Sequence, residues 1–215
     1  MTESKAVITV LAGTNGAGKS SIAGAERRAE KAEYYNPDEA ARAYLAAHPD
    51  STGEQANAAA WEFGRKLLEE AIRDSTDFAF ETTLGGNTIV ALLEKAADAG
   101  LDVRIWYAGL SSVELHLQRV RQRVKRGGHD IPEEMIRRRY ENGPRNLIRL
   151  MPKLAALRVY DNSAAGDPAA GVAPKPLLVL YAERGRIAAP RDLSRTPEWA
   201  KPIVARAIEL HQAKR

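Results

Sequence analysis

Residues 6–21 read AVITVLAGTNGAGKSS, and the rest of the chain is best understood from this stretch outward. Residues 6–12 are apolar except for Thr9, which is typical of a buried strand in a parallel sheet. The next eight residues, GTNGAGKS at 13–20, fit the pattern G-x-x-x-x-G-K-[ST]. The sequence therefore predicts a strand, a phosphate-binding loop, and a helix that begins near Lys19.

Each residue type in this loop has a physical purpose. Glycine permits the backbone angles that turn successive N–H groups into one concavity, and the helix N-terminus adds further donors. Lys19 is expected to reach the β- and γ-phosphates of a nucleotide, and the Ser20 hydroxyl to bind Mg²⁺. The predicted nucleotide-binding residues of the loop are Gly13, Thr14, Asn15, Gly16, Ala17, Gly18, Lys19, Ser20 and Ser21. The alternative is an ordinary glycine-rich turn.

Length and composition restrict the class of protein. The 215 residues suffice for one sizeable core, so a single domain over residues 1–215 is expected. The chain has no cysteine, which excludes disulfides, thiolate metal sites and a cysteine nucleophile. It shows neither a signal peptide nor an apolar run of membrane-spanning length, so we expect a cytoplasmic protein without a membrane partner. The formal net charge is +4, and residues 119–150 carry nine arginines and one lysine against four acids.

Strands and helices are predicted to alternate along the chain. After the loop, strands are expected at residues 33–35, 78–83, 103–108, 157–160 and 177–181, with the last one antiparallel. Helices are expected at residues 19–31, 37–47, 54–73, 85–97, 111–126, 133–141, 145–151 and 203–212. This order indicates an α/β, three-layer P-loop NTPase fold with a mostly parallel sheet of five to six strands. An arginine-rich helical lid is expected at about residues 112–151.

Four local expectations accompany this assignment. The buried stripe of the 54–73 helix should comprise Trp61, Leu67, Leu68 and Ile72. Ser111 and Glu114 fit a capping box for the helix that follows them. The stretch Asn142-Gly143-Pro144 should interrupt the lid helix, because proline lacks the N–H that a helix interior uses. Tyr34 is assigned to packing.

Two carboxylates follow predicted parallel strands. Asp38 comes just after the second strand, while Glu81 and Thr83 come at the end of the third. Ligands of open α/β sheets bind at the carboxyl ends of the strands, where these residues should lie near the loop. We expect Asp38 to act as a general base on an acceptor hydroxyl, and Glu81 to serve the metal or the substrate hydroxyls. The two roles could be exchanged, and Asp38 could instead only cap a helix.

The arginines of residues 119–139 are candidates for contacts with phosphate. Arg119, Arg123 and Arg126 have the i, i+4, i+7 spacing of one helix face, whereas Arg121 points elsewhere. Residues 137–139 are three consecutive arginines and cannot all face one site. We assign catalytic roles to Arg119 and Arg123, because guanidinium groups stabilise the charge on a transferring phosphoryl group. Arg126 and Arg138 are assigned to the nucleotide; the alternative is a solvated helical hairpin.

At this point the sequence resembles a known family. The loop GTNGAGKSS, then NPD at 36–38, FAFETTL at 78–84, and RVRQRVKRGGHDIPEEMIRRRYENGPRNL at 119–147 resemble the zeta-toxin-like P-loop kinases, specifically their short free-standing members. The resemblance covers about residues 6–150. It is carried mainly by the order of the motifs, with RGGHDIP followed by IRRRY.

The resemblance implies an enzyme that uses ATP and Mg²⁺, with a UDP-linked amino sugar as the acceptor in the toxin members. It implies that Asp38 is the general base, and that Glu81 and Thr83 bind the sugar nucleotide. It also implies an antitoxin protein as a candidate partner. Two positions depart from the toxin pattern: Thr82 stands where the toxins have glycine, and His129 falls near their second lid arginine.

The sequence therefore favours a small-molecule kinase that moves the γ-phosphate of ATP to a hydroxyl. One alternative is a polynucleotide 5′-hydroxyl kinase, although the basic segment 119–150 carries a single aromatic residue, Tyr140, on which a base could stack. The other alternative is a switch or binding module that only hydrolyses its nucleotide.

Overall fold

The computed structural model describes residues 5–19, 22, 34–128, 130–164 and 175–214. Within them the strands are β1 (Val7–Ala12), β2 (Tyr34–Tyr35), β3 (Phe78–Thr82), β4 (Asp102–Gly109), β5 (Ala156–Asp161), β6 (Leu177–Glu183) and β7 (Arg186–Ala189). The helices are α2 (Pro37–Ala47), α3 (Gly53–Asp74), α4 (Asn87–Asp98), α5 (Val113–Lys125), α6 (Glu133–Leu150) and α7 (Lys201–Gln212).

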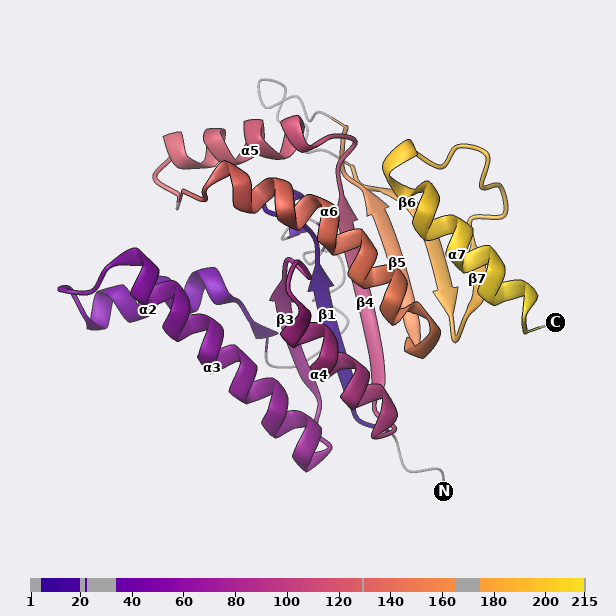
Figure 1. The fold of residues 1–215 in the computed structure, drawn as a ribbon, viewed down its shortest axis with the longest axis horizontal. Coiled ribbons are helices and arrows are strands. Elements are labelled where there is room, and N and C mark those ends of the chain that lie inside the picture. The colour runs from indigo at the N-terminus through magenta and orange to yellow at the C-terminus, as the bar shows by residue number, and fades with distance from the viewer. Residues whose placement is uncertain (1–4, 20–21, 23–33, 129, 165–174, 215) are drawn as a thin grey trace.

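A single sheet organises these elements (Figure 1). Its strand order is β2-β3-β1-β4-β5-β6-β7, parallel from β2 to β5 and antiparallel beyond β5. The α/β fold with a mostly parallel sheet is confirmed. In the described residues the sheet has seven strands, one more than the upper prediction. The extra strand is β7, because the chain turns back at Arg184 and Gly185, both at positive φ, and pairs with β6.

The register of the sheet brings the candidate site residues to one edge. Ala12, the last residue of β1, is paired with Thr82 of β3 on one side and with Tyr107 of β4 on the other. The chain therefore leaves β1 and β3 at the same edge, as parallel strands require. In Figure 1 the arrowheads of these strands point toward α5 and the first half of α6.

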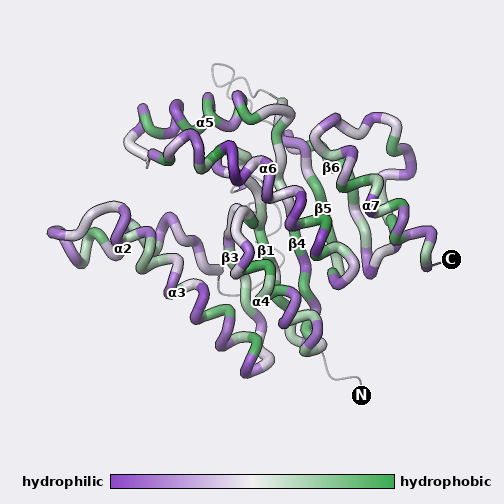
Figure 2. Tube along the Cα trace, viewed as in Figure 1, coloured by the Kyte–Doolittle hydropathy of each residue, from purple (hydrophilic) through white to green (hydrophobic). Residues whose placement is uncertain are grey.

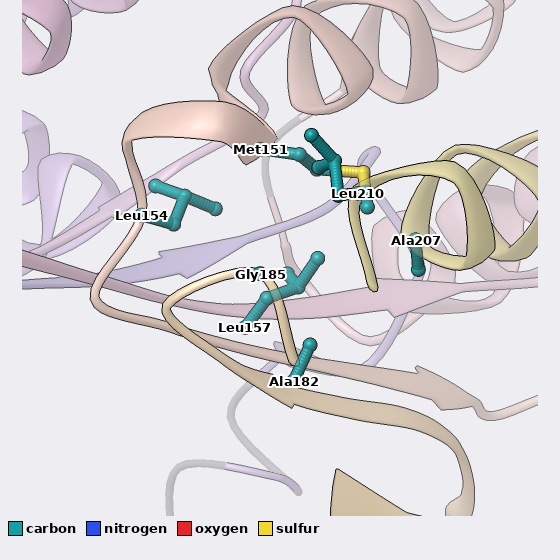
Figure 3. Close-up of a pocket in the computed structure, with 7 residues that line it drawn as sticks. All are labelled: Met151, Leu154, Leu157, Ala182, Gly185, Ala207 and Leu210. Atoms are coloured by element: carbon teal, nitrogen blue, oxygen red, sulfur yellow. The ribbon is translucent and has the colours of Figure 1, made fainter. Parts of the chain in front are cut away.

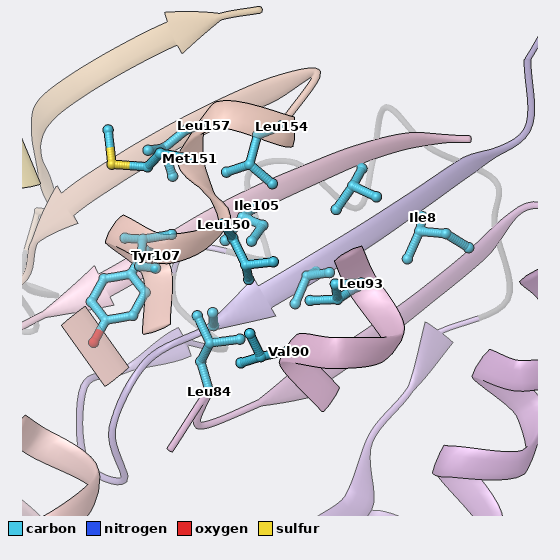
Figure 4. Packing of buried hydrophobic residues seen from close by; sticks show 14 of the residues in the cluster. Ile8, Leu84, Val90, Leu93, Ile105, Tyr107, Leu150, Met151, Leu154 and Leu157 are labelled. Atoms are coloured by element: carbon cyan, nitrogen blue, oxygen red, sulfur yellow. The ribbon is translucent and has the colours of Figure 1, made fainter. Parts of the chain in front are cut away.

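The main core lies between the sheet and the helices α3, α4, α6 and α7. Ile8, Ile105, Val90, Leu93 and Leu150 are each 1% exposed or less, and Figure 4 shows them packed together. Figure 2 shows the matching pattern, with hydrophobic stretches along β1 and β4 and a mixture of both classes along α3 and α5. A smaller cluster on the opposite face joins Leu11, Trp106 and Ala108 of the sheet to Ala17 and Ile22.

The helix α6 is continuous, so the predicted break at residues 142–144 is wrong. Pro144 lies inside the helix, and the buried residues Ile136, Gly143, Leu147 and Leu150 form one stripe along it. Burial of this stripe outweighs the hydrogen bond that Pro144 cannot donate. Gly143 sits where α6 crosses Tyr107, and a β-carbon there would lie 2.7 Å from the Tyr107 hydroxyl oxygen.

Two smaller expectations are also corrected. Ser112 rather than Ser111 caps α5, since the Ser112 side chain accepts from the N–H of Leu115. The Ser111 N–H instead donates to Ser163 Oγ at 2.7 Å. Trp61 is 48% exposed and does not belong to the buried stripe of α3. That stripe is formed by Ala56, Ala60, Leu68, Ala71 and Ile72.

Several predictions fall outside the described residues. They concern Ser20, Ser21, His129, most of the first helix, and most of the loop at residues 163–176. None of the described helices is both long enough and apolar enough to cross a membrane.

Gly109 at the end of β4 provides a test of this packing. A β-carbon there would lie 2.2 Å from a ring carbon of Trp199, whose Nε1 donates to Asp161 Oδ1 at 3.3 Å. Gly109→Ala should therefore lower the free energy of unfolding by about 1–3 kcal/mol, as overpacking does. Gly86→Ala is the matched control, since its β-carbon meets nothing within 4 Å. Equal melting temperatures for the two variants would contradict the predicted contact.

Candidate active site

The loop after β1 depends on glycine at three positions. Gly13 has φ +142°, and a β-carbon there would lie 2.3 Å from the carbonyl oxygen of Ala108. Its N–H donates to the Thr82 carbonyl at 3.2 Å, which ties the loop to the end of β3. Gly16 and Gly18 have φ +82° and +78°. Positive φ at these two positions, with Ala17 between them, is the alternation that forms an anion-binding nest of N–H groups.

Lys19 is buried at the base of this loop. Its side chain is only 8% exposed, and Nζ donates to the Gly13 carbonyl at 2.9 Å. The same ammonium lies 3.2 Å from Glu81 Oε1. A buried charge is tolerated only when it is paired and hydrogen-bonded, and both conditions are met here.

Glu81 has partners for both of its oxygens. Oε1 faces Lys19, and Oε2 accepts a hydrogen bond of 2.9 Å from the Tyr34 hydroxyl. The carboxylate comes from β3, the hydroxyl from β2 and the ammonium from the loop after β1. Tyr34, which the sequence assigned to packing, therefore has a polar role at this edge.

Asp38 lies at the start of α2 and is not the cap of that helix. Asn36 is the cap, because its side-chain oxygen accepts from the N–H groups of Asp38 and Glu39. The Asp38 carboxylate is half exposed and pairs with Arg123 Nη1 at 3.4 Å. The alternative of a pure capping role is thus removed, and Asp38 faces the α5–α6 hairpin.

The predicted arginines separate into different places. Arg123 reaches Asp38, whereas Arg119 donates to the carbonyl oxygens of Asn162 at 2.8 Å and Ala164 at 3.4 Å. Burial lowers the pKa of Arg119. Arg126 is the C-cap residue of α5, and both Arg126 and Arg138 are exposed. Neither of them forms a hydrogen bond or ion pair with the described residues of the loop.

Arg139 is the arginine of α6 that reaches the loop. Its Nη1 donates to Asn15 Oδ1 at 2.7 Å, and burial, together with the charge of Arg138, lowers its pKa. Sequence reasoning did not single out this residue among the three consecutive arginines. In a continuous helix, position 139 lies beside Ile136 and Gly143 on the buried stripe, and the other two arginines point away.

His116 of α5 was also missed. It is 1% exposed, and its Nδ1 lies 2.8 Å from the carbonyl oxygen of Asn15. Its ring meets Tyr140 of α6 edge-on at 5.5 Å between centroids. Burial is the main cause that lowers the pKa of His116 to about 4, and the nearby charges of Lys19 and Arg119 act in the same direction. The sequence pattern that could have indicated it is a single polar residue, His116, in the apolar stripe that includes Leu117 and Val120.

Thr83 lies in a tight loop after β3. Its Oγ1 accepts from the Gly85 N–H at 3.4 Å, and the Thr82 Oγ1 accepts from the Leu84 N–H at 3.1 Å. Asn146 of α6 donates to the Leu84 carbonyl at 2.8 Å. The predicted substrate residue is therefore held against the same hairpin that carries the arginines.

Figure 3 shows a crevice that lies away from this edge and is too small for a nucleotide. Its volume is about 10 Å³, near that of a single water, and Leu154, Leu157 and Leu210 are among its apolar lining residues. The residues gathered at the carboxyl edge of the sheet are the better candidates.

Comparison with known sequences identifies relatives. A family model described as Zeta toxin matches residues 1–166. An uncharacterized protein of Haemophilus influenzae is 40% identical over 80 residues, which are 36% of this chain and 57% of that protein. The alignment thus spans less than two thirds of that relative.

Solved structures share the fold at low sequence identity. AvrRxo1-ORF1:-ORF2 with ATP has a TM-score of 0.65 and 15% identity over 95% of this chain and 64% of the matched chain. The PezAT toxin-antitoxin system of Streptococcus pneumoniae has a TM-score of 0.57 and 13% identity over 97% of this chain and 88% of the matched chain. The Pnkp1/Rnl/Hen1 RNA repair complex has a TM-score of 0.52 and 17% identity over 91% of this chain and 51% of the matched chain. These likenesses establish a P-loop kinase fold.

The pKa of His116 predicts a pH-dependent stability. Its folded value of about 4 lies below the ordinary 6.5, so the unfolded chain binds the proton first as the pH falls. The contribution of the neutral His116 ring to the free energy of unfolding is complete above pH 6.5 and is lost progressively toward pH 4. Between neutral pH and pH 5 the loss should be about 2 kcal/mol.

Melting curves of the wild type and of His116→Asn across this range would measure that loss. The variant carries no titrating group at this position, so its melting temperature should fall less steeply with pH. Parallel curves for the two proteins would contradict a buried neutral imidazole.

Proposed function

The chain belongs to the zeta-toxin family, and on this premise we propose that it is an ATP-dependent phosphotransferase that moves the γ-phosphate to a hydroxyl of a small molecule. The observation that carries the proposal is the arrangement at the carboxyl edge of the sheet. The buried Lys19 lies in the phosphate loop, and the exposed Asp38 faces Arg123 of the α5–α6 hairpin.

The surroundings of the two carboxylates support different roles. Glu81 is engaged at both oxygens, by Lys19 and by Tyr34, so it is suited to orienting groups rather than to taking up a proton. Asp38 is half exposed, and the partner shown for its carboxylate is Arg123 at 3.4 Å. We assign the general base to Asp38, which would accept the hydroxyl proton as the acceptor oxygen bonds to the γ-phosphorus and the bond from that phosphorus to the departing ADP breaks.

Positive groups surround the place where phosphate would bind. Lys19 would exchange Glu81 for the β- and γ-phosphates, and Arg119 and Arg123 would stabilise charge on the transferred group. Arg126 and Arg138 stay predictions as nucleotide contacts, and they would have to turn inward from their exposed positions.

The oxygen donors at this edge fit a nucleotide-bound Mg²⁺. Such an ion keeps several waters and takes one or two protein oxygens. Ser20 and Glu81 are the groups that would hold it, and the bound ion would neutralise charge on the β- and γ-phosphates.

A sugar nucleotide is the acceptor that family membership suggests, with Glu81 and Thr83 as its contacts. Thr83 supports this assignment through its place beside the loop, in the turn that Asn146 holds. An antitoxin protein is the partner to seek, since the PezAT relative is a toxin-antitoxin system.

The polynucleotide alternative finds less support in the charges. Arg121, Arg137 and Arg149 of the hairpin pair with Glu133, Glu114 and Glu94, which leaves less positive charge for a phosphate backbone. The likeness to the RNA repair complex concerns the fold.

Transfer of labelled γ-phosphate from ATP with Mg²⁺ should separate these functions. The purified protein is incubated with sugar nucleotides, with 5′-hydroxyl oligonucleotides, or without an acceptor. Label on a sugar nucleotide supports the proposal, label on an oligonucleotide supports the polynucleotide kinase, and inorganic phosphate alone supports the switch. Lys19→Ala is the control and should abolish every one of these signals.

Asp38→Asn tests the base directly. The substitution removes the proton acceptor, so single-turnover transfer should fall roughly 10²–10⁴-fold. ATP affinity and the melting temperature should change little, because Asn36 caps α2. Glu81→Gln is the comparison, and a loss of transfer in that variant alone would move the base to Glu81.

A further inference from the structure

We propose that His116 is a positioning residue of the phosphate loop, which fixes the peptide between Asn15 and Gly16 so that its N–H faces the nucleotide phosphates. The inference rests on the proposed nucleotide site and adds a residue on α5 that controls the shape of that site.

The contact defines the protonation of the ring. A carbonyl oxygen can only accept, so Nδ1 of His116 must carry a proton to bond Asn15 at 2.8 Å. The low pKa keeps the ring neutral near pH 7, and the proton therefore stays on Nδ1 while Nε2 has none. An imidazolium here would add a charge beside Lys19 and Arg119.

The geometry of the peptide bond carries the effect into the loop. In a trans peptide the C=O of one residue and the N–H of the next point in opposite directions. A carbonyl of Asn15 that is bonded to His116 thus directs the N–H of Gly16 away from α5. Gly16 has φ +82° and is one of the nest glycines, so this N–H is one of the expected phosphate donors.

Close packing leaves little room for another loop shape. A β-carbon on Gly16 would lie 2.8 Å from the backbone carbonyl oxygen of His116 and 3.4 Å from Arg119 Cβ. The loop and α5 therefore touch backbone to backbone at this point. If the Asn15 peptide flipped, its carbonyl would enter the place of the phosphate and the Gly16 N–H would face α5.

A second contact holds the same residue from the neighbouring helix. Arg139 of α6 donates to Asn15 Oδ1 at 2.7 Å, while Tyr140 packs edge-on against the His116 ring. Asn15 is thus held at its main chain by α5 and at its side chain by α6. Both helices of the α5–α6 hairpin thus hold Asn15, and His116 supplies the main-chain half of that contact.

Three variants separate positioning from plain packing. His116→Phe keeps a buried ring but leaves the Asn15 carbonyl without its donor, whereas His116→Asn can place an amide N–H near the position of Nδ1. His48→Phe is the matched control, because His48 Nδ1 also lies near a backbone carbonyl, that of Tyr44 at 3.0 Å, but on the exposed surface of α2. ATP·Mg²⁺ affinity is measured by titration, together with the melting temperature and, where transfer is observed, kcat and KM for ATP.

We expect His116→Phe to weaken ATP binding about tenfold or more, since a lost donor leaves a buried carbonyl unsatisfied. The effect should fall on ATP affinity and on KM for ATP more than on kcat. His116→Asn should recover most of the affinity, and His48→Phe should match the wild type. Wild-type affinity in folded His116→Phe, or equal losses in the Phe and Asn variants, would overturn the inference.

A measurement on the wild type covers the case in which His116→Phe does not fold. Nitrogen NMR of the imidazole should show a neutral ring with the proton on Nδ1, and ATP·Mg²⁺ should shift the Gly16 amide signal. A proton on Nε2, or an unshifted Gly16 amide in the bound state, would overturn the inference. ATP binding without transfer to any acceptor would instead refute the phosphotransferase and leave the role of His116 standing.

Discussion

The buried ammonium of Lys19 is the constraint around which this edge of the sheet is built. Its charge must be paired, and the pairing joins the loop after β1 to Glu81 of β3, which in turn accepts from Tyr34 of β2. Removing one partner of a buried ion pair typically costs about 3–5 kcal/mol. A group that replaces Glu81 beside Lys19 must therefore be an anion, and a phosphate meets that need. We propose that a bound nucleotide takes over the role of the carboxylate beside Lys19.

The α5–α6 hairpin completes the site from the other side. It reaches the loop through Asn15, held by His116 and Arg139, and it reaches α2 through the pair of Arg123 and Asp38. The predicted phosphate loop, the proposed base and the arginines proposed to stabilise charge therefore lie on elements that contact one another. The same hairpin therefore contacts both the loop and the proposed base.

Much of the fold and of the candidate site could be predicted from the sequence, because the loop motif and the parallel sheet follow simple rules. The loop motif fixes the positions of Gly13 and Lys19, and the parallel sheet brings Glu81 and Asp38 to the same edge. What failed depended on tertiary packing. The break assigned at Pro144 is wrong, and the continuous α6 holds Arg139, next to its buried stripe, against Asn15 of the loop. His116 gave only a weak local signal, one polar residue in an apolar stripe, because its partner is 101 residues away in the chain.

A crystal structure with Mg²⁺ and a non-hydrolysable ATP analogue tests the central claim most directly. The prediction is that Lys19 Nζ leaves Glu81 and contacts β- and γ-phosphate oxygens, while Glu81 keeps its hydrogen bond from Tyr34. Asp38 should then lie on the open side of the γ-phosphate, where an acceptor hydroxyl can approach in line. A nucleotide bound elsewhere, or Lys19 still paired with Glu81 beneath a bound triphosphate, would contradict the account.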